Sequence, residues 1–344
     1  MTTPTIARPG TSFGTRVGRV FKARETGILI AFVAVAAIAT GVNPTFLLSP
    51  DGWRDLLLTP TLLVLLAVGE AMVIITRNVD LSVGSVVGLS TWICGQTYIA
   101  FPHMPIVVIF LIGIVSGALM GLLNGVIVTF AKVPALVVTL GTLYIYRGIT
   151  VLWAGSNLVV SSNLPPAFQS LGTSSILFIP DLAIIAAVVA IIAGWALRNL
   201  RAGREFYAIG SDPAAATLYG LRSRRRVLTA FIVSGSLAGL TGVLSLAYYA
   251  SASSQTGSGY ELQAVAAAVI GGVAIFGGSG TILGAVIGAL LLTTINRALP
   301  VVNIPDDWQQ AITGILIIAA IILDRLLLIR STRKLTIAED STNV

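Results

Sequence analysis

Residues 104–131 read MPIVVIFLIGIVSGALMGLLNGVIVTFA, a run that contains no ionisable side chain. A helix needs roughly 20 apolar residues to cross about 30 Å of hydrocarbon, so this run is long enough to span a membrane. Similar runs recur along the chain and are separated by proline, asparagine, aspartate and charged residues. They predict spans at 27–48, 59–76, 81–100, 104–131, 134–153, 176–197, 227–250, 261–276, 281–298 and 307–329. The expected fold class is therefore an all-α integral membrane protein of about ten transmembrane helices.

The composition agrees with a membrane protein. Hydrophobic residues make up 56% of the chain and charged residues 10%, whereas soluble domains average about 45–50% and about 25%. The single cysteine, Cys94, lies inside an apolar run, which excludes a disulfide framework and a cluster of thiolate metal ligands. The segment before residue 27 is polar and basic without a small-residue cleavage site, so we expect an uncleaved first helix.

The basic residues predict the orientation. If both termini are cytoplasmic, 18 of the 21 lysine and arginine residues fall on inside segments, and Arg54, Arg147 and Arg297 remain on the outer side or within spans. The opposite orientation would break the positive-inside rule. This bias accounts for the net charge of +7, so the charge does not indicate that the protein binds nucleic acid. The expected organisation is a basic cytoplasmic segment at 1–26, a transmembrane domain at 27–329 with a cytoplasmic loop at 198–226, and a cytoplasmic tail at 330–344.

Small residues recur four apart in several spans, as at Gly113, Gly117 and Gly121 and at Gly235 and Gly239. This spacing lets helix backbones approach closely in lipid, so these faces are expected to be packing seams. The stretches 81–88 and 279–288 share a small-residue pattern, which suggests two related halves around a central pathway. Composition alone can also make glycine-rich helices look alike.

The cytoplasmic loop contains the signals of a short helix. Asp212 can accept hydrogen bonds at its start, Pro213 suits the first helical position, alanines follow, and Gly220 can end it. These signals predict a helix of about seven residues along the inner membrane surface. One interpretation is a docking element for a cytoplasmic partner. The other is a surface turn with arginines that face lipid.

Enzyme signatures are missing from the sequence. A phosphate-binding loop needs a Gly-Lys-Ser/Thr ending, and no Gly-Lys pair occurs. His103 stands between two prolines without a second histidine or a cysteine near it, so it is expected to be a loop residue and not a metal ligand. We therefore expect that the chain is not an enzyme and binds no cofactor.

Polar residues within spans are costly and often face a cavity or a partner helix. Asp80 is expected to cap a helix, and a pair between Glu70 and Arg147 is possible without support from spacing. The candidates for a solute pathway are Asn124, Thr139, Thr142, Tyr144, Arg147, Gln255, Glu261 and Asn296. Neutral members of this set would suit a hydroxylated solute, and they would equally suit interhelical hydrogen bonds. Glu261 would equally suit a helix cap.

Four blocks in order resemble one protein family. They are NVDLSVG at 78–84, the run from Val133 to Gly148, GREFYAIG at 203–210 and the glycine-rich stretch at 271–284. The chain resembles the sugar-type permeases of bacterial ABC importers, such as those for ribose, rhamnose and the autoinducer-2 signal, within the branched-chain amino acid and sugar permease superfamily. Asn78 departs from the family pattern, where many relatives have glycine.

The resemblance implies partners that the chain itself does not contain. They are a second permease subunit, identical or homologous; two cytoplasmic ABC ATPase subunits or a fused pair, which use ATP and Mg; and an extracytoplasmic solute-binding protein. It also implies a location in the bacterial inner membrane. The ATPase-coupling residues that it implies are Gly203, Arg204, Tyr207, Ala208, Gly210, Asp212, Pro213, Ala214, Ala215 and Gly220.

The expected function is inward transport of a small sugar or sugar-like solute, rhamnose-like, ribose-like or autoinducer-2, by alternating access. The alternative is a secondary transporter or channel for a small polar solute driven by an ion gradient, with Glu70 or Glu261 as the coupling carboxylate.

Overall fold

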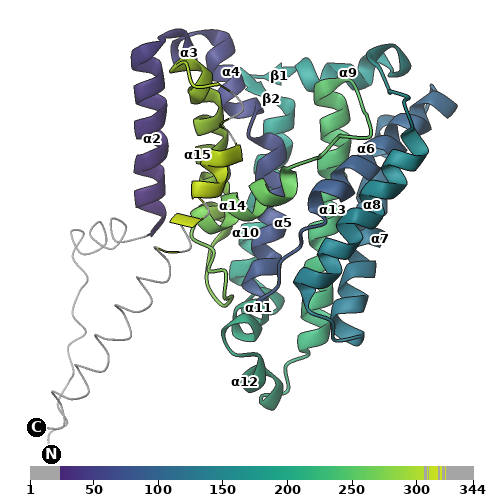
Figure 1. Ribbon diagram of the computed structural model, residues 1–344, viewed down its shortest axis with the longest axis vertical. Helices are drawn as coiled ribbons and strands as arrows, with labels where there is room; N and C mark the ends of the chain where they lie inside the picture. The colour runs from purple at the N-terminus through teal and green to yellow at the C-terminus, as the bar shows by residue number, and fades with distance from the viewer. Residues whose placement is uncertain (1–23, 306–307, 309, 317, 320–321, 323–344) are drawn as a thin grey trace, which may run out of the picture.

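The computed structural model describes residues 24–305, 308, 310–316, 318–319 and 322. It is a bundle of helices with one two-stranded hairpin (Figure 1). The elements are α2 (Arg24–Val42), α3 (Thr45–Leu48), α4 (Pro50–Leu58), α5 (Thr61–Ile75), α6 (Val83–Ala100), α7 (Ile106–Phe130), α8 (Ala135–Ala154), η1 (Ser161–Asn163), α9 (Pro166–Thr173), β1 (Ser175–Ile176), β2 (Ile179–Pro180), α10 (Asp181–Asn199), α11 (Arg201–Ser211), α12 (Pro213–Leu218), α13 (Ser223–Tyr249), α14 (Tyr260–Ile270) and α15 (Ile282–Val301).

Helix α5 forms the centre of the bundle. All of its residues are buried, as expected for a helix that is apolar on every side and surrounded by protein. Helices α10, α13, α14 and α15 pack around it. Any movement of α5 would therefore shift the packing of these four helices.

Seven helical segments in the described part of the chain are long and apolar enough to cross a membrane, at 25–42, 50–75, 106–130, 135–154, 181–199, 223–249 and 282–301. The segment at 50–75 comprises α4 and α5. The all-α membrane fold is confirmed. The count of ten spans and the cytoplasmic termini stay predictions, and most of the expected last span at 307–329 lies outside the described residues.

The expected spans at 81–100 and 261–276 differ from the others. Helix α6 is long enough, but it carries Ser85, Ser90 and Thr91 and is buried in protein along most of its length, which is why its polar groups are tolerated. The span expected at 261–276 is wrong in its length, because α14 ends at Ile270. Gly271 and Gly272, the latter with φ +91°, end it there. At 11 residues it rises only about 16 Å, half of the hydrocarbon thickness.

The seam predicted from the glycine spacing lies between α7 and α13. A Cβ atom at Gly117 would lie 2.1 Å from the carbonyl oxygen of Gly235 and 2.7 Å from the Cα atom of Gly239. Gly113 and Gly121 are in similarly close contact with α13. The seam is confirmed, whereas the two-half repeat stays a prediction.

Replacing Gly117 by valine is expected to lower the stability of the fold, because α7 and α13 would have to separate to make room. The expected loss is about 1–3 kcal/mol, measured as a lower melting temperature of the purified protein in detergent. Gly141→Val is the matched control, since a Cβ atom at exposed Gly141 on α8 meets nothing within 4 Å. Equal melting temperatures for the two variants would contradict the seam.

Candidate functional site

Helices α11 and α12 follow the last turn of α10 and lie at one end of the bundle, opposite α3, α4 and α9 (Figure 1). The helix predicted after Asp212 is present as α12. Asp212 Oδ1 accepts hydrogen bonds from the backbone N–H groups of Ala214 and Ala215, each at 2.9 Å. Pro213 occupies the first helical position, and Gly220 has φ +75° just after the helix ends. Local sequence signals therefore build this element as expected.

Two large apolar side chains extend from the end of α12. Leu218 is 88% exposed and Tyr219 is 86% exposed. Ala214 and Ala208, on the neighbouring turn and on α11, are exposed as well. Apolar side chains exposed together at the tip of a projecting helix are typical of a surface that a partner covers. Neither Leu218 nor Tyr219 was among the coupling residues predicted from the sequence.

Helix α11 is fixed to the membrane-spanning helices by close backbone contacts. A Cβ atom at Gly210 would lie 1.8 Å from the carbonyl oxygen of Ile75, the last residue of α5. That same oxygen accepts a hydrogen bond from the N–H group of Gly278 at 3.0 Å. The Tyr207 hydroxyl donates to the carbonyl oxygen of Gly280 at 2.9 Å. Helix α11 thus contacts both the end of α5 and the segment that joins α14 to α15.

Two further coupling candidates hold the turn between α10 and α11. Gly203 lies against Leu197, where a Cβ atom would be 2.2 Å from the carbonyl oxygen. Arg204 is exposed and its Nη1 donates to the carbonyl oxygen of Asn199 at 3.1 Å. Gly203, Tyr207 and Gly210 therefore serve packing in the chain itself, whereas Arg204 and the exposed face of α12 are accessible.

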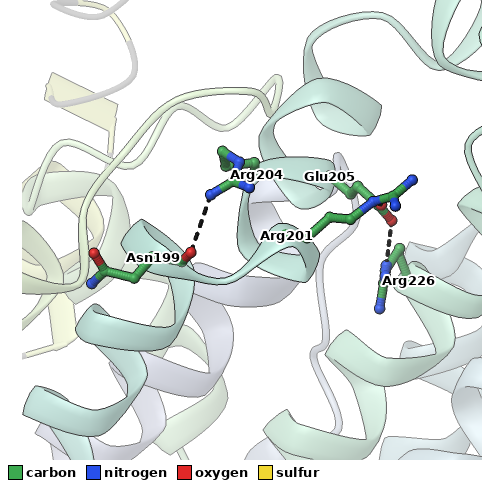
Figure 2. A network of polar contacts seen from close by, with 5 residues as sticks. All are labelled: Asn199, Arg201, Arg204, Glu205 and Arg226. Carbon is green, nitrogen blue, oxygen red and sulfur yellow. Dashed lines mark hydrogen bonds and ion pairs between the residues drawn. The ribbon is translucent and has the colours of Figure 1, made fainter.

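An ion-pair network ties α11 to α13, and Figure 2 shows its members. Glu205 Oε1 lies 2.8 Å from Arg201 Nε, and its Oε2 lies 2.6 Å from Arg226 Nε. Glu205 is buried, and the hydrogen bond from Arg226, followed by that from Arg201, lowers the pKa of its carboxyl below the ordinary value. Sequence analysis did not identify this network. The spacing of Arg201 and Glu205 was a signal for one pair, but nothing local indicated Arg226.

The lowered pKa of Glu205 predicts a pH-dependent stability. A carboxyl whose folded pKa is depressed stabilises the fold above its unfolded pKa, and that stabilisation is lost as the pH falls through the folded value. We expect wild type to melt at a higher temperature than Glu205→Gln above pH 4.5, the ordinary value, and this difference to shrink below it. Thermal melts of both proteins from pH 7 downward measure the effect. A constant difference across this range would contradict the ion-pair interpretation.

At the opposite end of the bundle lies a polar cavity of about 270 Å³. It is lined by Thr59, Leu62, Leu63, Tyr249, Tyr260, Gln263, Thr293, Asn296 and Arg297. Asn296 Oδ1 and Arg297 Nη1 are buried and have no hydrogen-bond partner in the described part of the chain. A buried polar atom without a partner needs an explanation, and a polar ligand in the cavity would supply one. Asn296 was among the pathway candidates predicted from the sequence. Tyr249, Tyr260 and Gln263 were not, because nothing in the sequence indicates that their side chains face a cavity.

Three other pathway candidates use their side chains in hydrogen bonds within the protein. The Asn124 amide donates to Ser82 Oγ at 2.8 Å, and the Thr139 hydroxyl donates to the carbonyl oxygen of Val79 at 3.2 Å. The Thr142 hydroxyl donates to the carbonyl oxygen of Thr139 at 3.3 Å. For these three residues the structure favours the interhelical or intrahelical role over solute contact.

Arg147 and Glu261 hold the segment between α13 and α14. Arg147 Nη1 donates to the carbonyl oxygen of Thr256 at 2.7 Å, and Glu261 Oε1 accepts from the N–H group of Gly259 at 3.2 Å. Glu70 accepts from the backbone of Asp80 at 3.1 Å, so the side chains of Glu70 and Arg147 bind different partners and the suggested pair is wrong.

The remaining candidates lie apart from the cavity lining. Gln255 and Tyr144 are exposed, on the segment before α14 and on α8. Asp80 Oδ1 accepts from the N–H group of Ser82 at 3.0 Å, but Ser82 is the N-cap of α6, so Asp80 orders the turn before the helix and does not cap it as expected. The Asp80 side chain is buried.

Comparison with known proteins gives a consistent set of relatives. The family described as "Branched-chain amino acid transport system / permease component" matches residues 54–321. The chain is similar to the "Autoinducer 2 import system permease protein LsrC" of Enterobacter sp. (strain 638), with 35% identity over 89% of this chain and 88% of the relative. The protein of the same description from Escherichia coli (strain K12 / DH10B) is 36% identical over 76% of each chain. No solved structure matches.

Proposed function

The chain belongs to the branched-chain amino acid transport system / permease component family, and from this membership we propose that it is the membrane-spanning permease subunit of an ATP-driven importer for a small, sugar-like solute. The sequence-based interpretation as such a permease, and as a multi-pass protein of the bacterial inner membrane, is confirmed by the family match and by the named relatives. A permease subunit is a transport protein and not an enzyme.

The surface for an ATPase partner is proposed to be α12. The single observation that carries this part is the pair of exposed apolar side chains, Leu218 and Tyr219, on a capped helix beyond the end of the bundle. ATP and Mg would be bound by two ATPase subunits or a fused pair, each docked on one permease subunit. The second permease subunit is identical or homologous.

Docking would couple to transport through α11. Because Gly210 contacts Ile75 and Tyr207 bonds to Gly280, a displacement of α12 would be passed to α5 and to the segment before α15. Helix α5 at its first turn, and α15 toward its last turns, line the polar cavity at the opposite end of the bundle. Closure of the ATPases would thus open the cavity first outward and then inward, which is alternating access.

The solute is proposed to be a small hydroxylated molecule delivered by an extracytoplasmic binding protein. The relatives named above are autoinducer-2 import permeases, and the cavity offers hydroxyl, amide and guanidinium groups to a sugar-like molecule. Hydroxylated solutes of this kind include ribose-like and rhamnose-like sugars and autoinducer-2.

Reconstitution tests the proposal. The chain is copurified with its ATPase partner, placed in liposomes and supplied with the binding protein and radiolabelled ribose, rhamnose or autoinducer-2. We expect one loaded binding protein to stimulate ATP hydrolysis and uptake. Uptake that stops when the ion gradient is collapsed at constant ATP would instead support the gradient-driven transporter and overturn the importer.

A further inference from the structure

A large groove of about 970 Å³ lies between α2, α10, α11 and α15. It is separate from the polar cavity that Asn296 and Arg297 line. Its lining includes the start of α2 at Glu25, the end of α10 at Arg198 and Asn199, and the start of α15 at Thr281. All three helix ends lie at the α12 end of the bundle (Figure 1). The basic residues of this end assign it to the cytoplasmic side by the positive-inside rule.

The groove is polar at that end and apolar toward the middle of the bundle. Ala187, Ala190 and Gly194 form its wall on α10, and Ile282 and Val286 form its wall on α15. Twelve residues separate Ala187 from Asn199, a rise of about 18 Å along the helix. One leaflet of hydrocarbon is about 15 Å deep, so the apolar wall extends through the inner leaflet.

The mouth of the groove carries a net positive charge. Arg198 and Arg204 are both exposed there, and Arg198 makes no polar contact in the described part of the chain. Among the described lining residues the carboxylate is Glu25, which accepts a hydrogen bond from the Thr281 hydroxyl at 2.6 Å. Trp195, 57% exposed, lies one turn deeper on α10, at the level where indole rings sit in membranes.

We propose that this groove is a binding site for one acidic phospholipid of the inner leaflet. Its phosphate is held by Arg198 and Arg204, and its acyl chains lie along the small residues of α10. Basic pockets between helices on the cytoplasmic side are suited to anionic headgroups. The N-terminal segment of the chain is a poor alternative occupant, because residues 1–23 carry four basic side chains and no acidic one, and the mouth of the groove is itself positively charged.

The test measures lipid binding by the full-length chain without ATPase or solute, so its failure is separate from a failure of the transport function. Delipidated protein is titrated with phosphatidylglycerol or phosphatidylethanolamine and followed by native mass spectrometry. Wild type is expected to bind one phosphatidylglycerol in preference to phosphatidylethanolamine. The double variant Arg198→Gln, Arg204→Gln should bind it about 30-fold more weakly, since each arginine near a lipid headgroup contributes about 1 kcal/mol.

Two further variants test whether the bound phosphatidylglycerol lies in this groove. Arg224→Gln with Arg225→Gln removes the same charge from the start of α13, outside the groove lining, and should leave binding unchanged. Ala190→Phe fills the apolar wall and should weaken binding while both arginines remain, with its melting temperature as the folding control. Equal loss in the Arg224 and Arg225 control, unchanged binding in Ala190→Phe, or displacement by inorganic phosphate alone would overturn the lipid site. So would equal affinity for the two lipids.

Discussion

Replacement of Leu218 and Tyr219 by glutamate is expected to abolish copurification of the ATPase partner and uptake by the reconstituted transporter. Apolar side chains at the centre of an interface each contribute about 2 kcal/mol or more to binding, so the loss of both weakens docking on the order of a thousandfold. The fold itself should be unaffected, because both side chains are almost fully exposed. The melting temperature of the isolated chain should therefore equal that of wild type.

A matched control for this variant lies at the opposite end of the helix bundle. Leu177 and Phe178, in the turn between β1 and β2, are 86% and 83% exposed. Their replacement by glutamate makes a closely similar chemical change at the end of the bundle opposite α12 and should leave ATPase copurification intact. If the Leu218 and Tyr219 variant still copurifies with ATPase and hydrolyses ATP in response to loaded binding protein, α12 is not the docking surface.

A substitution of Asp212 tests whether docking depends on the helical form of α12 or only on its exposed side chains. Asp212 supplies the two hydrogen bonds that begin the helix, and loss of such a cap costs about 0.5–2 kcal/mol. The cost falls on a short helix outside the core. The exposed side chains would then be presented by a less ordered segment, so a smaller loss of docking is consistent with the same surface.

Sequence analysis predicted α12 correctly because every signal for it is local. Asp212, Pro213 and Gly220 act on the backbone within a few residues of themselves, so their effect does not depend on the rest of the fold. The glycine seam was predictable for a similar reason: a four-residue period marks one helix face, although the sequence could not say that α7 packs on α13. The membrane class followed from apolar run length alone.

Features that depend on contacts between distant segments were not predictable. The partner of Glu205 on α13 is 21 residues away, and the partners of Arg147 lie more than 100 residues away. The polar residues Asn124 and Thr139 looked like pathway candidates because polarity within a span does not reveal which neighbour satisfies it. Helix α14 was predicted too long because an apolar run continues past Gly271, while the backbone at Gly272 cannot continue the helix.

Asn296→Leu is expected to raise the stability of the fold and to reduce solute uptake about tenfold or more. The two side chains are similar in size, and leucine removes a buried oxygen that has no partner in the described part of the chain. Removing an unpaired buried polar group stabilises a protein, whereas a solute hydroxyl left without its partner in the cavity costs about 1–3 kcal/mol. Stability and transport should therefore change in opposite directions.

Thr294→Val separates this explanation from a general effect on α15. The Thr294 hydroxyl is also buried without a partner in the described residues, but Thr294 is outside the lining of the cavity. The same gain in melting temperature with normal uptake is expected. Melting curves and initial uptake rates over a range of solute concentration measure both quantities, and the solute concentration for half-maximal uptake should rise in Asn296→Leu alone. If both variants transport normally, Asn296 does not contact the solute, and the buried oxygen of Asn296 is satisfied by water or by a partner subunit instead.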